Sequence, residues 1–279
     1  MSTIPLTDPR LAPARDPRPA GALRRVASIG ASEVRLFYRN KTVLLTAVLL
    51  GPAFAMVFLM NLDLTQTPNP TVVVTNLVFS FAAMMAMFYN LTAIYVTRRE
   101  DRVFKRLLTG EARPMEVAAA AATPSALIFV SQVVLAGVVA VVVFGSPSWD
   151  SPVLVVVAFG LTIVCLTGMS GWASSFTSNT EAAQYSTLPV LLVLLVLSGT
   201  SFPLSGMPDI FMTVAQTSPM YAASELISLG MSGVDLTGQQ YSGFVPTLQA
   251  ASRPLLVLGC WTVLGVWLAS RTMRFDPRR

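Results

Sequence analysis

The sequence predicts an all-α integral membrane protein with six transmembrane helices, and three observations lead to this fold class. Hydrophobic residues make up 53% of the 279-residue chain and charged residues only 12%, which is more apolar surface than a soluble fold of this size buries. The apolar residues fall into blocks of about 20, the length that crosses the hydrocarbon core of a bilayer. Nearly all the lysines and arginines lie in three short segments beside these blocks.

The N-terminal 40 residues divide into a tail and a helix. Residues 1–20 contain five prolines and almost no apolar side chains, so burial cannot offset the entropy lost on ordering and a disordered cytoplasmic tail is expected. Residues 21–40 predict an amphipathic interface helix. This helix either anchors to anionic lipid or also contacts a cytoplasmic partner. Its polar face holds Arg24, Arg25, Ser28, Ser32, Arg35 and Arg39.

Residues 41–275 are predicted to form one permease-like transmembrane domain. The third apolar run is longer than a bilayer requires, so we expect it to tilt, protrude or break near Pro124. Prolines and glycines interrupt the chain between the fifth and sixth spans, and short outer half-helices fit this pattern better than another span. The six spans are predicted at 42–61, 71–96, 115–144, 152–175, 185–203 and 253–271.

The distribution of basic residues predicts the orientation. Of the 19 lysines and arginines, eight precede the first span, six lie between Arg98 and Arg113, and four follow the sixth span; only Arg253 lies elsewhere. Because Lys and Arg are retained on the cytoplasmic side, we expect both termini in the cytoplasm. An even number of spans follows.

Several residue types are missing from the sequence. The chain has no histidine, and its two cysteines, Cys165 and Cys260, lie singly within predicted spans. We therefore assign no catalytic residue, metal ligand or disulfide. The net charge of +5 comes from residues beside the apolar blocks and not from a basic domain, so no nucleic-acid partner is expected. The long polar N-terminus also differs from a cleavable signal peptide.

The most specific segment is residues 97–117, between the second and third spans. On a helical wheel, one arc is apolar and includes Phe104, Leu107 and Leu108, and the opposite arc is basic and includes Arg98 and Arg102. This pattern is typical of a positive loop that only sets topology. The interpretation that we favour is a docking helix whose apolar ridge sits in a groove of a soluble partner.

Two further groups are candidates for the transport pathway. The second span is rich in Met and Phe, and Met adapts to differing apolar shapes; either a pathway for hydrophobic molecules or simple packing explains this. We place the substrate pathway at Met84, Met85, Phe88 and Asn90. The outer gate is placed at Pro203, near the breakable end of the fifth span, and at Glu225, a carboxylate expected near the outer surface.

The order of these segments resembles the permeases of the ATP-binding-cassette type-2 exporter family, in the short daunorubicin-resistance-like form. The similar parts are the Arg-rich N-terminal helix, the Arg-Glu-Asp…Val-Phe-Lys-Arg-Leu segment at 99–107, SGTSFPLSGMPDIF at 198–211 and SPMYAASELI at 218–227. The resemblance covers about residues 20–275. The turn at Thr109–Pro114 departs from the plainer Thr-Pro turn of many relatives.

The resemblance implies a six-span subunit in the bacterial plasma membrane that pairs with a second permease, expected to be an identical copy, and binds two copies of an ATPase. Coupling to the ATPase would then involve Arg35, Arg39, Arg98, Arg102, Phe104, Leu107 and Leu108. ATP and magnesium are expected on the partner alone, because neither lysine, Lys41 or Lys105, stands in a phosphate-binding loop. The chain itself is expected to be a transport subunit and no enzyme.

The function expected from these features is efflux of a small hydrophobic or amphipathic compound, such as an antibiotic or a lipid-like molecule, by alternating access. Export of a polysaccharide or another polymer is one alternative. A secondary transporter or channel is another, although it should show buried carboxylates or repeats that are absent from the sequence. An intramembrane enzyme would need a nucleophile with a base or a metal cluster.

Overall fold

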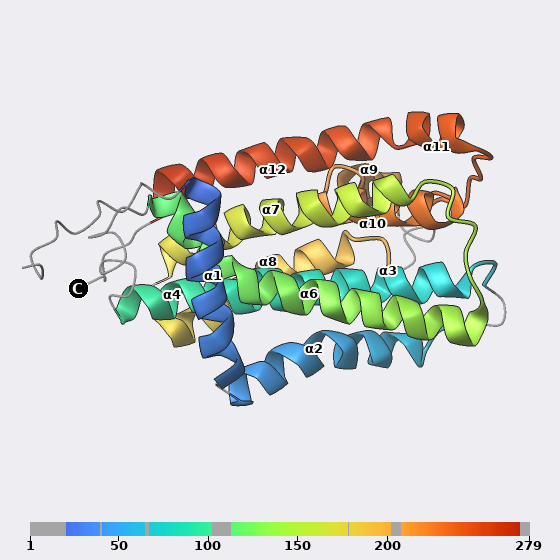
Figure 1. The fold of residues 1–279 in the computed structure, drawn as a ribbon. Coiled ribbons are helices and arrows are strands. Elements are labelled where there is room, and N and C mark those ends of the chain that lie inside the picture. Colours follow the sequence, from blue (N-terminus) through green and yellow to red (C-terminus); the bar gives the residue numbers. More distant parts are fainter. Residues whose placement is uncertain are drawn as a thin grey trace, which may run out of the picture.

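The computed structural model describes residues 21–39, 41–64, 67–101, 113–177, 179–201 and 208–273. These residues form helices and turns, with one isolated β-bridge between Val234 and Gln240. The predicted all-α class is confirmed. The long helices lie side by side, and α1 (Ala22–Arg39) crosses one end of them (Figure 1). The last turns of α12 (Ser252–Thr272) reach the same end, which we call the α1 end.

Four helical stretches are long and apolar enough to cross a membrane, which makes this a multi-pass membrane protein. They are Pro70–Glu100, α6 (Pro114–Phe144), α7 (Pro152–Phe176) and α12. Two further helices, α2 (Lys41–Leu59) and α8 (Thr180–Val196), lie where the first and fifth spans were predicted. The count of six spans remains a prediction.

The structure narrows one prediction about the spans and corrects another. Of the three alternatives for the long third span, a break near Pro124 is excluded, because α6 runs through this proline without interruption for 31 residues; tilting and protrusion remain. The fifth span was expected at 185–203, but α8 begins earlier, where the Asn179 side chain accepts a hydrogen bond from the Ala182 N–H at 2.7 Å and caps the helix. The helix also ends earlier, and a turn follows in which Gly199 has φ +73°.

The second span contains a π-helical segment that the sequence did not indicate. It consists of α3 (Pro70–Ala82), the π-helical segment η3 (Ala83–Asn90) and α4 (Leu91–Glu100). Such segments interrupt α-helices mostly at functional sites. Most of this span is buried among the other helices, so it forms the centre of the bundle.

The helices α7 and α12 pack closely because of two glycines. A Cβ built on Gly168 would lie 2.4 Å from the carbonyl carbon of Gly265, which leaves no room for any larger residue. Small residues allow such close backbone contact between membrane helices. The pair α7–α12 forms one wall of the bundle (Figure 1).

Three short helices lie between α8 and α12: α9 (Asp209–Ala215), α10 (Pro219–Ser232) and α11 (Phe244–Ala250). They gather at the end opposite α1 (Figure 1). Nearly all of α10 is buried, packed against α7, α12 and α3. The Asn76 amide of α3 donates to the Ser224 carbonyl of α10 at 2.9 Å, and the Ser80 and Ser224 hydroxyls lie 3.1 Å apart.

Candidate functional site

Four consecutive residues at the end of α4 together bind three other helices of the bundle. The Thr97 hydroxyl lies 3.1 Å from that of Thr180, at the start of α8. Glu100 accepts a hydrogen bond from the same Thr180 hydroxyl at 2.6 Å. Arg98 binds α1 and Arg99 binds α7, as described below. We call residues 97–100 the α4 node. It forms the start of the predicted docking segment, of which residues 102–112 lie outside the described residues.

Arg99 is buried, with 1% of its surface exposed. Its guanidinium donates to the Ser174 carbonyl at 2.9 Å and also to the Thr177 carbonyl. Both carbonyls lie at the C-terminal end of α7, where a helix has unsatisfied acceptors and a partial negative charge that attract a cation. Arg99 therefore fixes the end of α7 to the end of α4.

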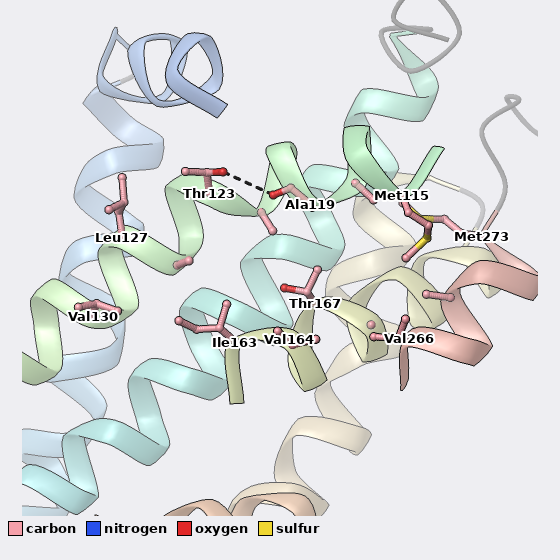
Figure 2. Close-up of a pocket in the computed structure, with 15 residues that line it drawn as sticks. Met115, Ala119, Thr123, Leu127, Val130, Ile163, Val164, Thr167, Val266 and Met273 are labelled. Carbon is pink, nitrogen blue, oxygen red and sulfur yellow. Dashed lines mark hydrogen bonds between the residues drawn. The ribbon is translucent and has the colours of Figure 1, made fainter. Parts of the chain in front are cut away.

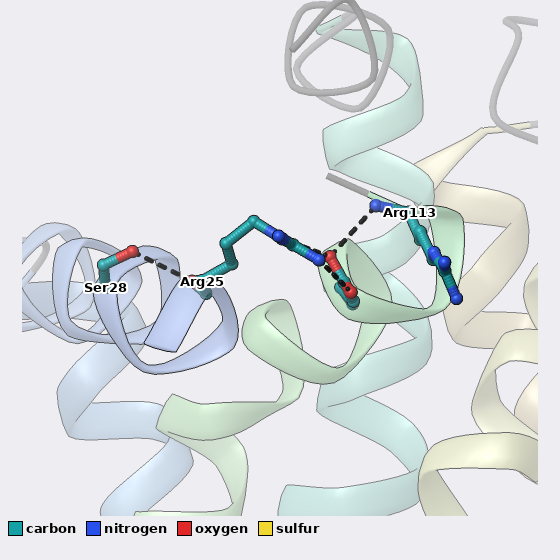
Figure 3. A network of polar contacts seen from close by, with 4 residues as sticks. Arg25, Ser28 and Arg113 are labelled. Atoms are coloured by element: carbon teal, nitrogen blue, oxygen red, sulfur yellow. Dashed lines mark hydrogen bonds and ion pairs between the residues drawn. The ribbon is translucent and has the colours of Figure 1, made fainter. Parts of the chain in front are cut away.

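Two ion pairs hold α1 on the bundle, and we call them the α1 clamp. The Arg25 guanidinium binds the Glu116 carboxylate of α6 through two contacts of 3.0 and 2.9 Å, drawn in Figure 3. Arg98 binds Glu33 of α1. Between the two pairs, Gly30 packs against Thr123 of α6 so closely that a Cβ would lie 2.7 Å from the Thr123 hydroxyl.

The clamp is partly removed from water. Burial raises the pKa of the Glu33 carboxyl above its ordinary value, although Arg98 acts in the opposite direction. Glu116 also accepts a hydrogen bond from the Arg113 backbone N–H at 3.1 Å (Figure 3). One carboxylate thus fixes both the start of α6 and the first turns of α1.

The predicted coupling residues fall into three groups. Arg98 belongs to the clamp, and Arg35 and Arg39 lie exposed on α1. The remaining four, Arg102, Phe104, Leu107 and Leu108, lie outside the described residues. On the helical wheel Arg99 belongs to the same basic arc as Arg98 and Arg102, and Arg25 to the polar face of the first helix. Both instead turn toward the bundle, and Glu33 and Glu116 were not singled out at all.

The predicted substrate residues all lie in η3. Met84, Met85 and Phe88 are buried in the hydrophobic core of the chain. Asn90 is half-buried and donates to the Ser125 hydroxyl of α6 at 3.5 Å. These residues line neither of the two cavities described below.

Of the predicted outer gate, Pro203 lies outside the described residues. Glu225 lies half-buried on α10 and interacts electrostatically with Asp235 and Arg253. The turn after α8 joins this region, because the Thr200 hydroxyl donates to the Ser80 hydroxyl at 2.9 Å. The polar side chains of α3, α10 and this turn thus form one connected group.

Two cavities lie on the sides of the bundle. The larger has a volume of about 490 Å³ and runs between α6, α7 and α12 at the α1 end. Figure 2 shows Met115 and Met273 at one end of it and Leu127 and Val130 toward the other. The smaller, of about 310 Å³, lies between α3, α6, α7 and α10 toward the opposite end. Both are lined almost wholly by apolar side chains.

The apolar helices that are long enough to cross a membrane, packed into one bundle, define a helical multi-pass membrane protein. The model of the ABC-2 type transporter family matches residues 25–231, and the chain belongs to this family. A comparison with curated proteins found no match. The membrane domain of this family is a transport permease, and such permeases generally work with ATPase subunits.

Proposed function

We propose that this chain is the permease subunit of an ATP-driven exporter in the bacterial plasma membrane. In this proposal two permease subunits, identical copies of the chain, assemble with two copies of a separate ATPase, which holds the ATP and magnesium. Both termini lie in the cytoplasm. The complex moves a small hydrophobic or amphipathic compound out of the cytoplasm by alternating access.

The single observation that carries the proposal is the α4 node. Its four residues bind α1, α7 and α8 at the start of the predicted docking segment. Any displacement of that segment by an ATPase therefore pulls on three further elements at once. Packed helices shift as units between discrete arrangements, so this connection converts a movement at the α1 end into a movement of the spans.

The substrate pathway in this proposal follows the second span. Met84, Met85 and Phe88 now pack inside the chain, so a substrate reaches them only after the second span moves against its neighbours. The π-helical hydrogen bonding of this stretch favours such a rearrangement, since π-bulges accompany functional sites. Asn90 lines the same pathway, and Pro203 and Glu225 act at the outer gate.

The test truncates the apolar ridge of the docking segment. In Phe104→Ala and Leu107→Ala, contacts worth roughly 2 kcal/mol each are lost if the side chains are buried in a groove of the partner. We expect less ATPase to copurify with these variants and substrate-stimulated ATP hydrolysis to fall, while membrane insertion is normal. Arg102→Lys keeps the positive charge and serves as the matched control.

A loop that only sets topology needs its charges and not its apolar ridge. If both alanine variants bind the ATPase and transport normally, the coupling role of this segment is wrong, and α1 becomes the element to test. Copurification with a nucleotide-binding subunit also separates an exporter from a secondary transporter or channel, which would function alone.

A further inference from the structure

We propose that the larger cavity, the groove between α6, α7 and α12, binds an acyl chain of an anionic glycerophospholipid. The lipid belongs to the leaflet at the α1 end. This site is separate from the substrate pathway of the second span, so the inference stands whether or not the proposed transport function is correct.

The chemistry of the groove fits a hydrocarbon chain. Its α6 wall consists largely of alanines, whose small side chains open the space, and its α7 wall presents Ile163 and Val164. Thr123 is one of two hydroxyl-bearing residues in the lining, and it donates to the Ala119 carbonyl of its own helix at 3.4 Å (Figure 2). A polar ligand would therefore lose its hydration here and gain few hydrogen bonds in exchange. An acyl chain has no hydrogen bonds to water that it could lose.

The groove is open to the hydrocarbon region. Leu127 and Val164, which line it, are 52% and 44% exposed. The same three helices are candidate spans and carry further exposed apolar side chains beyond the groove, such as Leu135 and Val263. Their outer surfaces therefore face lipid unless another protein covers them.

The length of the groove favours one lipid chain over a helix of another protein. From Met115 to Val130 it covers about 22 Å of α6 at 1.5 Å per residue. One leaflet contributes about half of a hydrocarbon core that is roughly 30 Å thick. The groove thus begins at the end of the span and is longer than the roughly 15 Å of one leaflet but shorter than the whole core, whereas a spanning partner helix would need a surface along the whole bilayer.

The charge at its end favours an anionic headgroup. Arg113, exposed at the N-cap of α6, is two residues from Met115, and Arg271, exposed in the last turn of α12, is two residues from Met273. The carboxylate of the first turn of α6, Glu116, is already bound by Arg25. A cation near an anionic lipid surface contributes about fivefold to affinity.

The experiment uses the full chain in lipid nanodiscs containing phosphatidylglycerol with a photoreactive group in its acyl chain. We expect cross-links at Met115, Leu127 and Ile163 in excess over the outward-facing Leu135 and Val263. Ala119→Phe and Ala126→Phe fill the groove and should abolish this excess. Leu135→Phe adds the same ring to α6 outside the groove and should leave the excess unchanged.

Thermal unfolding checks that each variant is folded. Because Ala119 is exposed, a larger side chain there does not disturb the core, and Ala119→Phe tests the groove even if Ala126→Phe does not fold. Labelling spread evenly over all outward faces would mean ordinary boundary lipid and would overturn the proposal. A groove that stays unlabelled at every lipid content would mean that a second copy or another protein covers it, which overturns the proposal equally.

The headgroup is tested by competition with unlabelled lipid. We expect phosphatidylglycerol to displace the probe better than phosphatidylcholine, and Arg113→Gln to reduce this preference about fivefold. Arg253→Gln, at the opposite end of α12, removes the same charge as a control. Equal displacement by both lipids in the unmodified chain would contradict the anionic headgroup.

Discussion

At the scale of single residues, Arg99 is the side chain whose burial most needs an explanation. An arginine loses strong hydration when it is buried, so its donors must find acceptors. Here the acceptors are carbonyls of Ser174 and Thr177, which the end of α7 leaves without helical partners. The Arg99 side chain of α4 therefore provides hydrogen-bond donors for two carbonyls at the end of α7.

Replacing Arg99 should destabilise the chain. Arg99→Gln removes two charged hydrogen bonds worth about 1.5–3 kcal/mol each and leaves buried carbonyls with fewer donors. Arg99→Lys keeps the charge but lacks the planar fork that reaches two acceptors, so its effect should be intermediate. The measurement is the melting temperature of the detergent-solubilised chain. Exposed Arg39→Gln is the control, and equal melting temperatures for both Gln variants would contradict the role of Arg99.

The sequence could not have predicted this residue or its counterpart Arg25. A helical wheel arranges side chains around one helix axis, and it contains no information on which neighbour covers each face. Arg99 meets carbonyls 75 and 78 positions away, and Arg25 meets Glu116 across 91 positions. The sequence shows where the positive charges lie along the chain. Which groups these arginines bind depends on how helices that are distant in sequence pack together.

At the scale of secondary-structure elements, apolar periodicity and length were sufficient to place the long helices. The boundaries of α8 were missed because a capping residue, Asn179, starts the helix before the apolar run begins. The π-helical segment was missed because its hydrogen-bond pattern has no distinctive composition: Ala, Met and Phe suit an α-helix equally well.

In the Glu33–Arg98 pair of the α1 clamp, loss of the arginine should lower the stability of the chain more than loss of the glutamate. Glu33 is buried, with 8% of its side chain exposed, and Arg98 is 23% exposed. Arg98→Gln leaves a buried carboxylate without its partner and should cost about 1–3 kcal/mol. Glu33→Gln leaves a more exposed guanidinium and should cost less. Melting temperatures of the single and double variants measure this, and a double variant no more stable than Arg98→Gln would contradict it.

The defect of Arg98→Gln should also depend on pH. Burial already raises the pKa of Glu33, and removal of Arg98 takes away an interaction that lowers it. A carboxyl with a raised pKa in the folded state favours folding while it is protonated, and this contribution is lost as the pH rises through that pKa. The variant should therefore be closer to the unmodified chain at about pH 5 than at about pH 8. Glu33→Gln, which cannot titrate, is the control.

At the scale of the whole molecule, the described segments that were predicted to be cytoplasmic lie at one end of the bundle. The helix α1, the start of α8 and the last turns of α12 lie together, and the loop between α6 and α7 lies at the other end (Figure 1). The clustering of basic residues in the sequence predicted that these segments share one end. Segments that are retained on the same side of a membrane must also lie at the same end of the bundle. Which end faces the cytoplasm still rests on that rule.

Cysteine labelling tests the orientation. In a chain with Cys165 and Cys260 replaced by Ala, single cysteines at Ser2, Thr109, Asn179 and Arg279 should react only with cytoplasmic reagent. Cysteines at Gln66, Ser148 and Gln239 should react only from outside. Positions at the ends of predicted spans are avoided, so an error of a few residues does not alter the result. One clear reversal would sink the six-span arrangement.

The π-helical segment also determines in which direction the side chains of α4 point relative to those of α3. A π turn takes one residue more than an α turn, so every residue after η3 is rotated by about 100° from where an uninterrupted α-helix would place it. Asn76 before the segment faces α10, and Arg99 after it faces the end of α7. The irregular turn thus changes the relative direction of these two side chains, and in this fold each of them reaches its partner.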